Sequence, residues 1–142
     1  MVEHSLCLLK PDCIQRELTE TILKMVSATG LEIVAIKTTT LTKEDIKIFY
    51  KDYRDDDYFD DLSQFMQSGP VTVFIVKGEN AIEILSELVG FTEPSKAKTG
   101  TIRSMGTDIC RNLVHSSSDQ LAFLHEVGVI FDKQELKNIG IK

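Results

Sequence analysis

The order of apolar patterns along the chain restricts its fold more than any other feature of the sequence. Short runs rich in Val, Ile and Leu predict strands over residues 5–9, 31–36, 71–76 and 113–116. Apolar residues at helical spacing predict helices over residues 18–26, 43–50, 58–66, 81–89 and 120–127. The resulting order is strand, helix, strand, strand, helix, strand, with additional helices. This order is typical of the ferredoxin-like split β-α-β sandwich, so we predict an α+β fold with a four-stranded antiparallel sheet and helices on it.

The length and charge of the chain favour one domain over residues 1–142. A chain of 142 residues is long enough to bury a core of its own. The net charge of -6 argues against a general nucleic-acid binder, because binding to the phosphate backbone normally needs a basic face. No apolar run approaches the roughly 18 residues of a membrane-spanning helix, and the first residues lack the pattern of a signal peptide. We therefore expect a cytoplasmic protein.

Neither the cysteines nor the acidic residues predict a metal held by the protein. The cysteines are odd in number and form no C-x-x-C pair, so we expect them to be reduced and structural: Cys7, Cys13 and Cys110. The pair His125-Glu126 is not followed by a second histidine at helical spacing, as a metalloprotease site would require. The acidic residues between 55 and 61 lack the glycine and the distal glutamate of a calcium-binding loop, and we favour a solvated start of a helix there.

Three short segments contain residues that can carry chemistry. They are Lys10-Pro11-Asp12 after the first strand, Gly100-Thr101-Ile102-Arg103 in a long loop, and the residues from Asn112 to Ser117 on the last strand. Each segment alone is a weak signal. A lysine at a strand end is usually solvated, and a Gly-Thr turn is common. A single histidine such as His115 is more often structural than catalytic.

In combination, these segments resemble the nucleoside diphosphate kinase family over almost the whole length of the chain. The similarity also includes Leu8 and Leu9 before Lys10 and the segment 65–70. It implies an enzyme that moves the γ-phosphoryl group of a nucleoside triphosphate to a nucleoside diphosphate by a ping-pong reaction, through a phosphohistidine on His115. Phosphoryl transfer needs an in-line nucleophile and cations around the transferring oxygens. A neutral imidazole is a nucleophile that can form a labile phosphoramidate.

The resemblance also assigns roles to individual residues. The implied catalytic residues are His115, Lys10, Glu126, Tyr50 and Ser117. Within this group Glu126 would orient His115, and Ser117 would join their hydrogen bonds. The implied nucleotide-binding residues are Lys10, Tyr58, Thr92, Arg103 and Asn112. Tyr58 stands where the family usually has a phenylalanine stacked on the nucleobase, and an aromatic face stacks on any base, so we expect broad base tolerance.

Cofactor and partners follow from the same resemblance. The expected cation is Mg²⁺ carried by the phosphates of the nucleotide, which requires no cluster of metal ligands on the protein. The expected partners are nucleoside triphosphates and diphosphates and further copies of the chain, since members of the family are commonly hexamers or tetramers. No nucleic acid and no membrane is required.

Four departures from the family pattern leave a second function open. Ser86 stands where the family usually has a phosphate-binding arginine, Thr99 replaces a proline, and Ser116 replaces a glycine directly after the histidine. The segment between Arg103 and Asn112 is also one residue shorter than usual. If that glycine serves a positive φ, Ser116 would store strain. The alternative function is a catalytically weakened nucleotide-binding or interaction module with the same fold.

Overall fold

Four strands form one antiparallel sheet, as the order of apolar patterns predicts. The computed structural model describes residues 2–141. The strands are β1 (Val2–Leu9), β2 (Glu32–Thr39), β3 (Val71–Glu79) and β4 (Val114–Ser116), and they lie in the order β2-β3-β1-β4. Every neighbouring pair is antiparallel. The ferredoxin-like arrangement is therefore confirmed. The predicted domain bounds, 1 and 142, lie outside the described residues.

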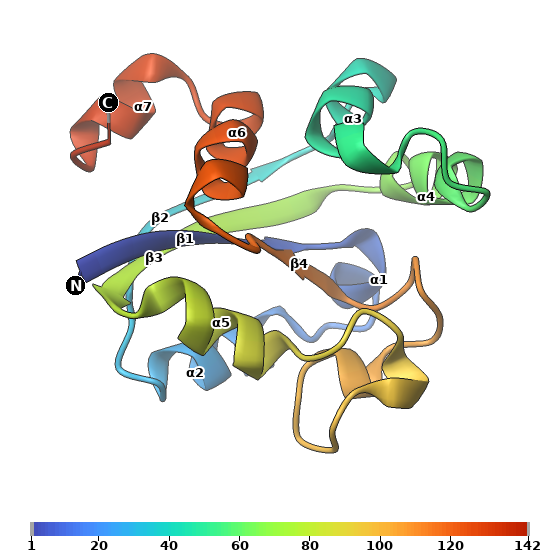
Figure 1. The fold of residues 1–142 in the computed structure, drawn as a ribbon, viewed down its shortest axis with the longest axis horizontal. Coiled ribbons are helices and arrows are strands. Elements are labelled where there is room, and N and C mark those ends of the chain that lie inside the picture. The colour runs from blue at the N-terminus through green and yellow to red at the C-terminus, as the bar shows by residue number, and fades with distance from the viewer. Residues whose placement is uncertain (1, 142) are drawn as a thin grey trace.

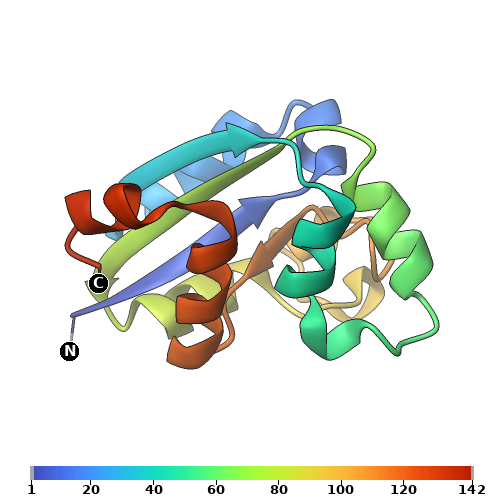
Figure 2. The same ribbon diagram turned by 90° about the horizontal axis from the view of Figure 1, so that it is seen from above.

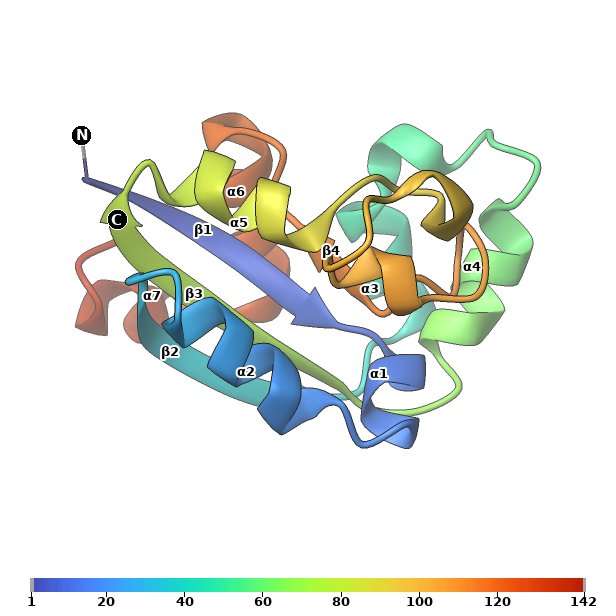
Figure 3. The same ribbon diagram turned by 90° about the horizontal axis from the view of Figure 1, so that it is seen from below.

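Helices cover both faces of the sheet and give the molecule three layers (Figure 1). One face carries α3 (Lys43–Phe49), α4 (Phe59–Met66), α6 (Gln120–Ile130) and α7 (Lys133–Asn138), which Figure 2 shows from above. The other face carries α2 (Thr19–Ser27) and α5 (Ala81–Val89), with the short α1 (Pro11–Gln15) directly after β1 (Figure 3). None of the helices within residues 2–141 has the length and apolar character needed to span a membrane.

Strand β1 runs through the middle of the molecule and is apolar on both sides. Leu6 and Leu8 belong to the core between the sheet and α3, α4 and α6. Cys7 and Leu9 belong to the core between the sheet and α2 and α5. Successive side chains of a strand point to opposite faces, so helices on both faces require an unbroken apolar run. This explains why the second half of β1, Leu6 to Leu9, shows no alternation of polar and apolar residues.

Two predicted helix starts are confirmed by their capping hydrogen bonds. The backbone N–H of Asp45 donates to Oγ1 of Thr42 at 3.0 Å, and the N–H of Thr42 donates back to the Asp45 carboxylate at 2.9 Å. Asp119 accepts a hydrogen bond from the N–H of Ala122 at 2.8 Å. These bonds satisfy N–H groups that have no partner inside the helix.

The structure differs from the sequence prediction in several short elements. Pro11 ends β1, as predicted, but it also opens α1, because the fixed φ of proline suits the first turn of a helix. Helix α7 is not predicted by the sequence analysis, although Asp132 and Glu135 form its capping box. The loops contain three 3-10 turns that were also not predicted: η1 (Lys51–Tyr53), η2 (Pro94–Lys96) and η3 (Arg103–Met105). Strands β2 and β3 each extend three residues beyond the prediction.

Candidate active site

His115 lies in the middle of β4, where that strand pairs with the end of β1. Its partner across the strands is Leu8. The rings of Phe49 and Tyr50, at the end of α3, pack edge-on against the imidazole with centroid distances of 5.0 and 5.7 Å. The side chain is mostly buried, with 14% of its surface exposed. A sheet strand and an aromatic wall therefore hold the ring in one place.

Glu126 on α6 holds the orientation of the imidazole. Its Oε2 lies 2.7 Å from Nε2 of His115, and its Oε1 accepts a hydrogen bond from Oγ of Ser117 at 2.7 Å. Ser117 is fully buried. An ionised carboxylate can only accept hydrogen bonds, so we assign the hydrogen of the neutral ring to Nε2. The lone pair of the ring then lies on Nδ1.

Lys10 is a buried cation at the end of β1. Only 3% of its surface is exposed. Its Nζ donates to Oδ1 of Asn112 at 2.8 Å and to the carbonyl oxygen of Cys110 at 3.1 Å. Burial, and after it the positive charge of Arg103, lower the pKa of Lys10 to about 7. The site therefore contains a lysine that can gain or lose its proton near neutral pH.

Asn112 connects this lysine to the loop that contains Thr92. The Asn112 side chain accepts from Lys10 through Oδ1 and donates through Nδ2 to the carbonyl oxygens of Thr92 and Ile109, at 2.8 and 3.2 Å. Both ends of the amide are used, which restricts Asn112 to one orientation. Asn112 thereby connects the backbone of Thr92 to Lys10.

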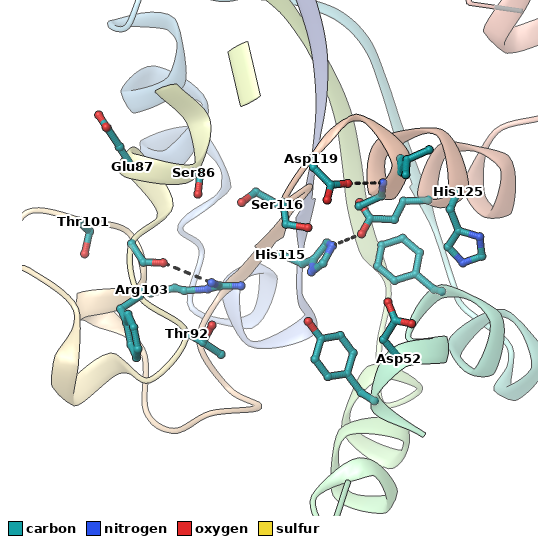
Figure 4. Close-up of a pocket in the computed structure, with 18 of the residues that line it drawn as sticks. Asp52, Ser86, Glu87, Thr92, Thr101, Arg103, His115, Ser116, Asp119 and His125 are labelled. Carbon is teal, nitrogen blue, oxygen red and sulfur yellow. Dashed lines mark hydrogen bonds and ion pairs between the residues drawn. The ribbon is translucent and has the colours of Figure 1, made fainter. Parts of the chain in front are cut away.

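The guanidinium of Arg103 lies beside the strand that carries His115. Its Nε and Nη2 donate to the carbonyl oxygen of Val114 at 3.2 and 3.0 Å. Its Nη1 donates to the carbonyl oxygen of Gly90 at 3.3 Å, and Figure 4 shows Arg103 in the larger cavity. Burial lowers the pKa of Arg103, but a guanidinium keeps its charge at neutral pH. A positive charge is thus held one residue from His115.

Two cavities meet at His115. The smaller, of about 210 Å³, is lined by seven of the nine predicted site residues: Lys10, Tyr50, Tyr58, Thr92, Arg103, Asn112 and His115. Of the other two, Glu126 lines the larger cavity, and Ser117 is buried and bound to Glu126. Tyr53, Leu62 and Ile109 also line this cavity and were not predicted as site residues. Leu62 was predicted as an apolar residue of a helix, not as a site residue. Tyr53 in η1 and Ile109 in the loop before β4 belong to no motif that would have indicated a site.

The larger cavity, of about 1060 Å³, continues past His115 between α5 and α6. Ser86 and Glu87 form one wall, Asp119 and His125 the opposite one, and Ser116 lies between them next to His115 (Figure 4). Lysines from the surrounding loops contribute to the rim: Lys51, Lys96 and Lys98. Helix α5 itself contains no Lys or Arg, so the wall at Ser86 lacks the cation that an arginine would supply there.

Two tyrosines line the smaller cavity, Tyr50 and Tyr58. The Tyr50 hydroxyl is buried and has no partner within residues 2–141. Burial raises the pKa of Tyr50 well above its ordinary value, so the group stays a neutral donor. Burial and a hydrogen bond to Asp56 raise the pKa of Tyr58 to about 12. Both phenols therefore keep their hydrogen at neutral pH.

Ser116 does not have the positive φ that would have caused strain. In the described part of the chain the non-glycine residues with positive φ are Glu17, Asn80 and Leu113. Ser116 is part of β4 and has the backbone of a strand. The replacement of glycine by serine therefore needs no unusual backbone in this chain.

The acidic segment before and in α4 contributes an ion pair to the neighbouring loop. Asp61 accepts hydrogen bonds from both terminal nitrogens of Arg111, at 2.9 Å each. The guanidinium of Arg111 also lies 5.0 Å from the centre of the Phe65 ring. Between residues 2 and 141, no three His, Cys, Asp or Glu side chains are arranged so that they could hold a metal ion.

Comparison with known proteins identifies the family of this arrangement. A relative described as nucleoside diphosphate kinase, from Persephonella marina, is 38% identical over 136 residues, which cover 95% of this chain and 97% of the relative. The crystal structure of the Aquifex aeolicus nucleoside diphosphate kinase superimposes with a TM-score of 0.90 at 32% identity, over 95% of this chain and 99% of that one. The Halobacterium salinarum enzyme in complex with CDP has a TM-score of 0.90 at 33% identity, covering 95% and 91%. The sequence profile of the family described as "Nucleoside diphosphate kinase" matches residues 3–136, so the chain belongs to that family.

Proposed function

We propose that this protein is an active nucleoside diphosphate kinase that transfers the γ-phosphoryl group of a nucleoside triphosphate to a nucleoside diphosphate through a phosphohistidine on His115. The observation that carries the proposal is the hydrogen bond between Nε2 of His115 and Glu126. This bond leaves the lone pair on Nδ1, and a nucleophile with a fixed direction is what in-line transfer requires.

In the first half-reaction, Nδ1 of His115 attacks the γ-phosphorus. The N–P bond forms as the bond between the γ-phosphorus and the bridging oxygen breaks, and the electron pair of that bond leaves with the β-phosphate of the nucleoside diphosphate. The ring acquires positive charge in this step. Glu126 stabilises that charge, because its carboxylate already accepts the hydrogen on Nε2 at 2.7 Å. Ser117 keeps Glu126 in place through the second carboxylate oxygen.

In the second half-reaction, a β-phosphate oxygen of another nucleoside diphosphate attacks the phosphorus on His115. The N–P bond breaks and its electron pair returns to Nδ1. The two half-reactions have the same geometry in opposite directions, so one site serves both, as a ping-pong reaction requires. The roles of Lys10 and Arg103 are to place positive charge beside the phosphoryl oxygens, and Tyr50 offers its buried hydroxyl as a donor.

The smaller cavity is the proposed place of the nucleoside. Tyr58 and Ile109 lie on its lining together with Leu62, and a ring against apolar side chains provides stacking without reading the edge of the base. The Thr92 hydroxyl would supply a neutral hydrogen bond to sugar or phosphate, and Oδ1 of Asn112 would accept one from a sugar hydroxyl, because both hydrogens of its amide are already used. Mg²⁺ would arrive with the nucleotide as part of the substrate. The CDP bound to the Halobacterium salinarum enzyme supports a nucleotide as the ligand of this fold.

We also propose a cytoplasmic homo-oligomer, either a tetramer or a hexamer. Large apolar side chains are exposed on two separate parts of the surface, and subunit contacts would cover such residues. Ile36 on the edge strand β2 is 55% exposed, and Phe91 in the long loop is 60% exposed. Light scattering of the purified protein would measure the number of subunits.

Labelling of the purified protein with ATP carrying a radioactive γ-phosphate tests the proposal. We expect a label on the chain that is stable in alkali and labile in acid, as a phosphohistidine is. His115→Ala should remove the label, and His125→Ala, which changes another histidine of the larger cavity, should keep it. A native chain without label would favour the alternative, a weakened nucleotide-binding or interaction module, for which Ser86 is the supporting observation.

A further inference from the structure

Leu113, two residues before His115, has a backbone conformation that a leucine rarely adopts. Its φ is +76°, and the N–H of Val114 donates to the carbonyl oxygen of Asn112 at 2.9 Å. Together these features define a γ-turn of the strained, positive-φ type. The side chain of Leu113 is fully buried in the core beside α5. Such a turn persists only where surrounding contacts hold it.

The segment that follows β1 supplies those contacts. The carbonyl oxygen of Leu113 accepts a hydrogen bond from the backbone N–H of Lys10 at 2.8 Å. The N–H of Leu113 donates to Oδ2 of Asp12 at 3.1 Å. Both backbone polar groups of the strained residue are therefore held from the same side. Of these two bonds, only the one to Asp12 depends on a side chain and can be removed by substitution.

The residues around this turn carry much of the proposed site. The Asn112 side chain accepts a hydrogen bond from Lys10 and donates one to the carbonyl oxygen of Thr92. The carbonyl oxygen of Val114 accepts two hydrogen bonds from the guanidinium of Arg103. His115 follows directly in β4. A rotation of the turn would move the nucleophile and the cations relative to one another, because they are attached on either side of it.

We propose that Asp12 is a positioning residue, whose carboxylate holds the strained turn at Leu113 and thereby sets the direction of His115 and the placement of Asn112. The inference rests on the proposed function. Asp12 lies outside both cavities at His115, so it acts through Leu113 and not on the nucleotide. Its Oδ1 is buried without a hydrogen-bond partner in the described part of the chain, and its Oδ2 accepts from Leu113, 101 positions away. The carboxylate also contacts backbone N–H groups of its own segment and interacts with the charge of Lys10.

Single-turnover phosphorylation of the full chain tests the role of Asp12. We expect Asp12→Ala to slow phosphorylation of His115 by about 10- to 100-fold, as a small misplacement of reacting groups does. Asp12→Asn keeps an oxygen that can accept from Leu113 and should stay within about threefold of the native rate. If Asp12→Asn is as slow as Asp12→Ala, the negative charge matters and the positioning role is wrong.

A second pair of variants tests the strained turn within one background. Leu113→Gly and Leu113→Ala remove nearly the same side chain, but only glycine adopts a positive φ without strain. In the Asp12→Ala background, we expect phosphorylation to be at least fivefold faster with Leu113→Gly than with Leu113→Ala. With Asp12 present, the two should differ by less than twofold. Equal rates in both backgrounds would overturn the proposal even if Asp12→Ala alone folds poorly.

The kinase function and the positioning role of Asp12 are tested by different outcomes. A native chain that is never labelled contradicts the proposed kinase function. A native chain that is labelled, with an unchanged rate for Asp12→Ala, contradicts only the positioning role. Hydrogen exchange adds a readout that does not depend on activity: the amide of Leu113 should be protected in the native chain and in Asp12→Asn, and should lose protection in Asp12→Ala. Protection that stays the same in Asp12→Ala would also overturn the role.

Discussion

Single side chains around His115 determine how strongly the phosphates are held. Ser86 lines the larger cavity on a helix without Lys or Arg, while Lys96 and Lys98 reach the same cavity from the loop after α5. Lys96 is exposed and forms an ion pair with Glu93 at 3.2 Å. Exposed lysines of this kind contribute little to a fixed phosphate site. The position of Ser86 is therefore where a new cation would have the largest effect.

We expect Ser86→Arg to lower KM for nucleoside diphosphates by roughly ten- to a hundredfold, since a charge-assisted hydrogen bond contributes about 1.5 to 3 kcal/mol. The value of kcat should stay within a few fold, because in the proposed reaction Lys10 and Arg103 are already beside the developing charge. Steady-state kinetics measure both, with Ser86→Ala as the control that adds no charge. If Ser86→Arg binds no better than the native chain, the loop between Thr92 and Arg103 already supplies the cation.

Lys10 should make nucleotide binding depend on pH. Its pKa is lowered to about 7, so above pH 7 the free site holds mostly neutral lysine. The negative charge of a bound phosphate favours the protonated form, so binding above pH 7 takes up a proton and the affinity falls as the pH rises. Calorimetry at pH 8 in two buffers with different ionisation enthalpies measures this uptake. Lys10→Arg carries a side chain that is always charged, so it should bind the nucleotide without taking up a proton. Equal heats in both buffers for the native chain would contradict the expectation.

At the scale of elements, α3 positions the aromatic wall of the site. The helix ends at Phe49, directly before Tyr50, and both rings pack against His115. Its start is fixed by the capping box of Thr42 and Asp45. The cap thus contributes to the stability of a helix whose other end packs against His115.

We expect Thr42→Ala to reduce the free energy of unfolding by about 1 kcal/mol, because it leaves the N–H of Asp45 without its partner. Urea unfolding followed by circular dichroism measures the change. Thr42→Ser keeps a hydroxyl and should remain close to the native stability. If Thr42→Ala had the same urea midpoint as the native chain, other contacts would have to hold the start of the helix.

At the scale of the whole molecule, His4 links stability to pH. It lies on β1 and stacks on Phe123 of α6, with ring centroids 6.1 Å apart, and its Nε2 is buried with no hydrogen-bond partner in residues 2–141. Burial, and after it the charge of Lys77, lower the pKa of His4 below its ordinary value of 6.5. The folded chain therefore binds fewer protons than the unfolded chain just below pH 6.5, so stability falls as the pH drops through that range.

We expect the urea midpoint to decrease between pH 7.5 and pH 5.5, and to decrease less in His4→Phe, which keeps a ring against Phe123 without a titrating group. All other side chains are the same in both proteins, so the difference between the two slopes isolates His4. A decrease of the same size in both proteins would show that His4 is not responsible.

The sequence by itself was sufficient for the order of the strands and the longer helices, and the family resemblance named nine candidate site residues. Strands such as 71–76 and helices such as 81–89 are recognisable because their burial patterns repeat over neighbouring residues. Caps at Thr42 and Asp119 depend on bonds within three residues, so a local pattern predicts them. The nine site residues were found through the resemblance, and their roles remain predictions.

Only the tertiary structure decided how those residues face one another. The hydrogen bond between His115 and Glu126 joins β4 to α6, and the hydrogen bond from Leu113 to Asp12 joins residues 101 positions apart. Ile109 lines the smaller cavity together with Tyr58 and Leu62, which come from a distant part of the chain. Contacts of this kind depend on the docking of separate elements in three dimensions, and no periodic pattern along the chain encodes them.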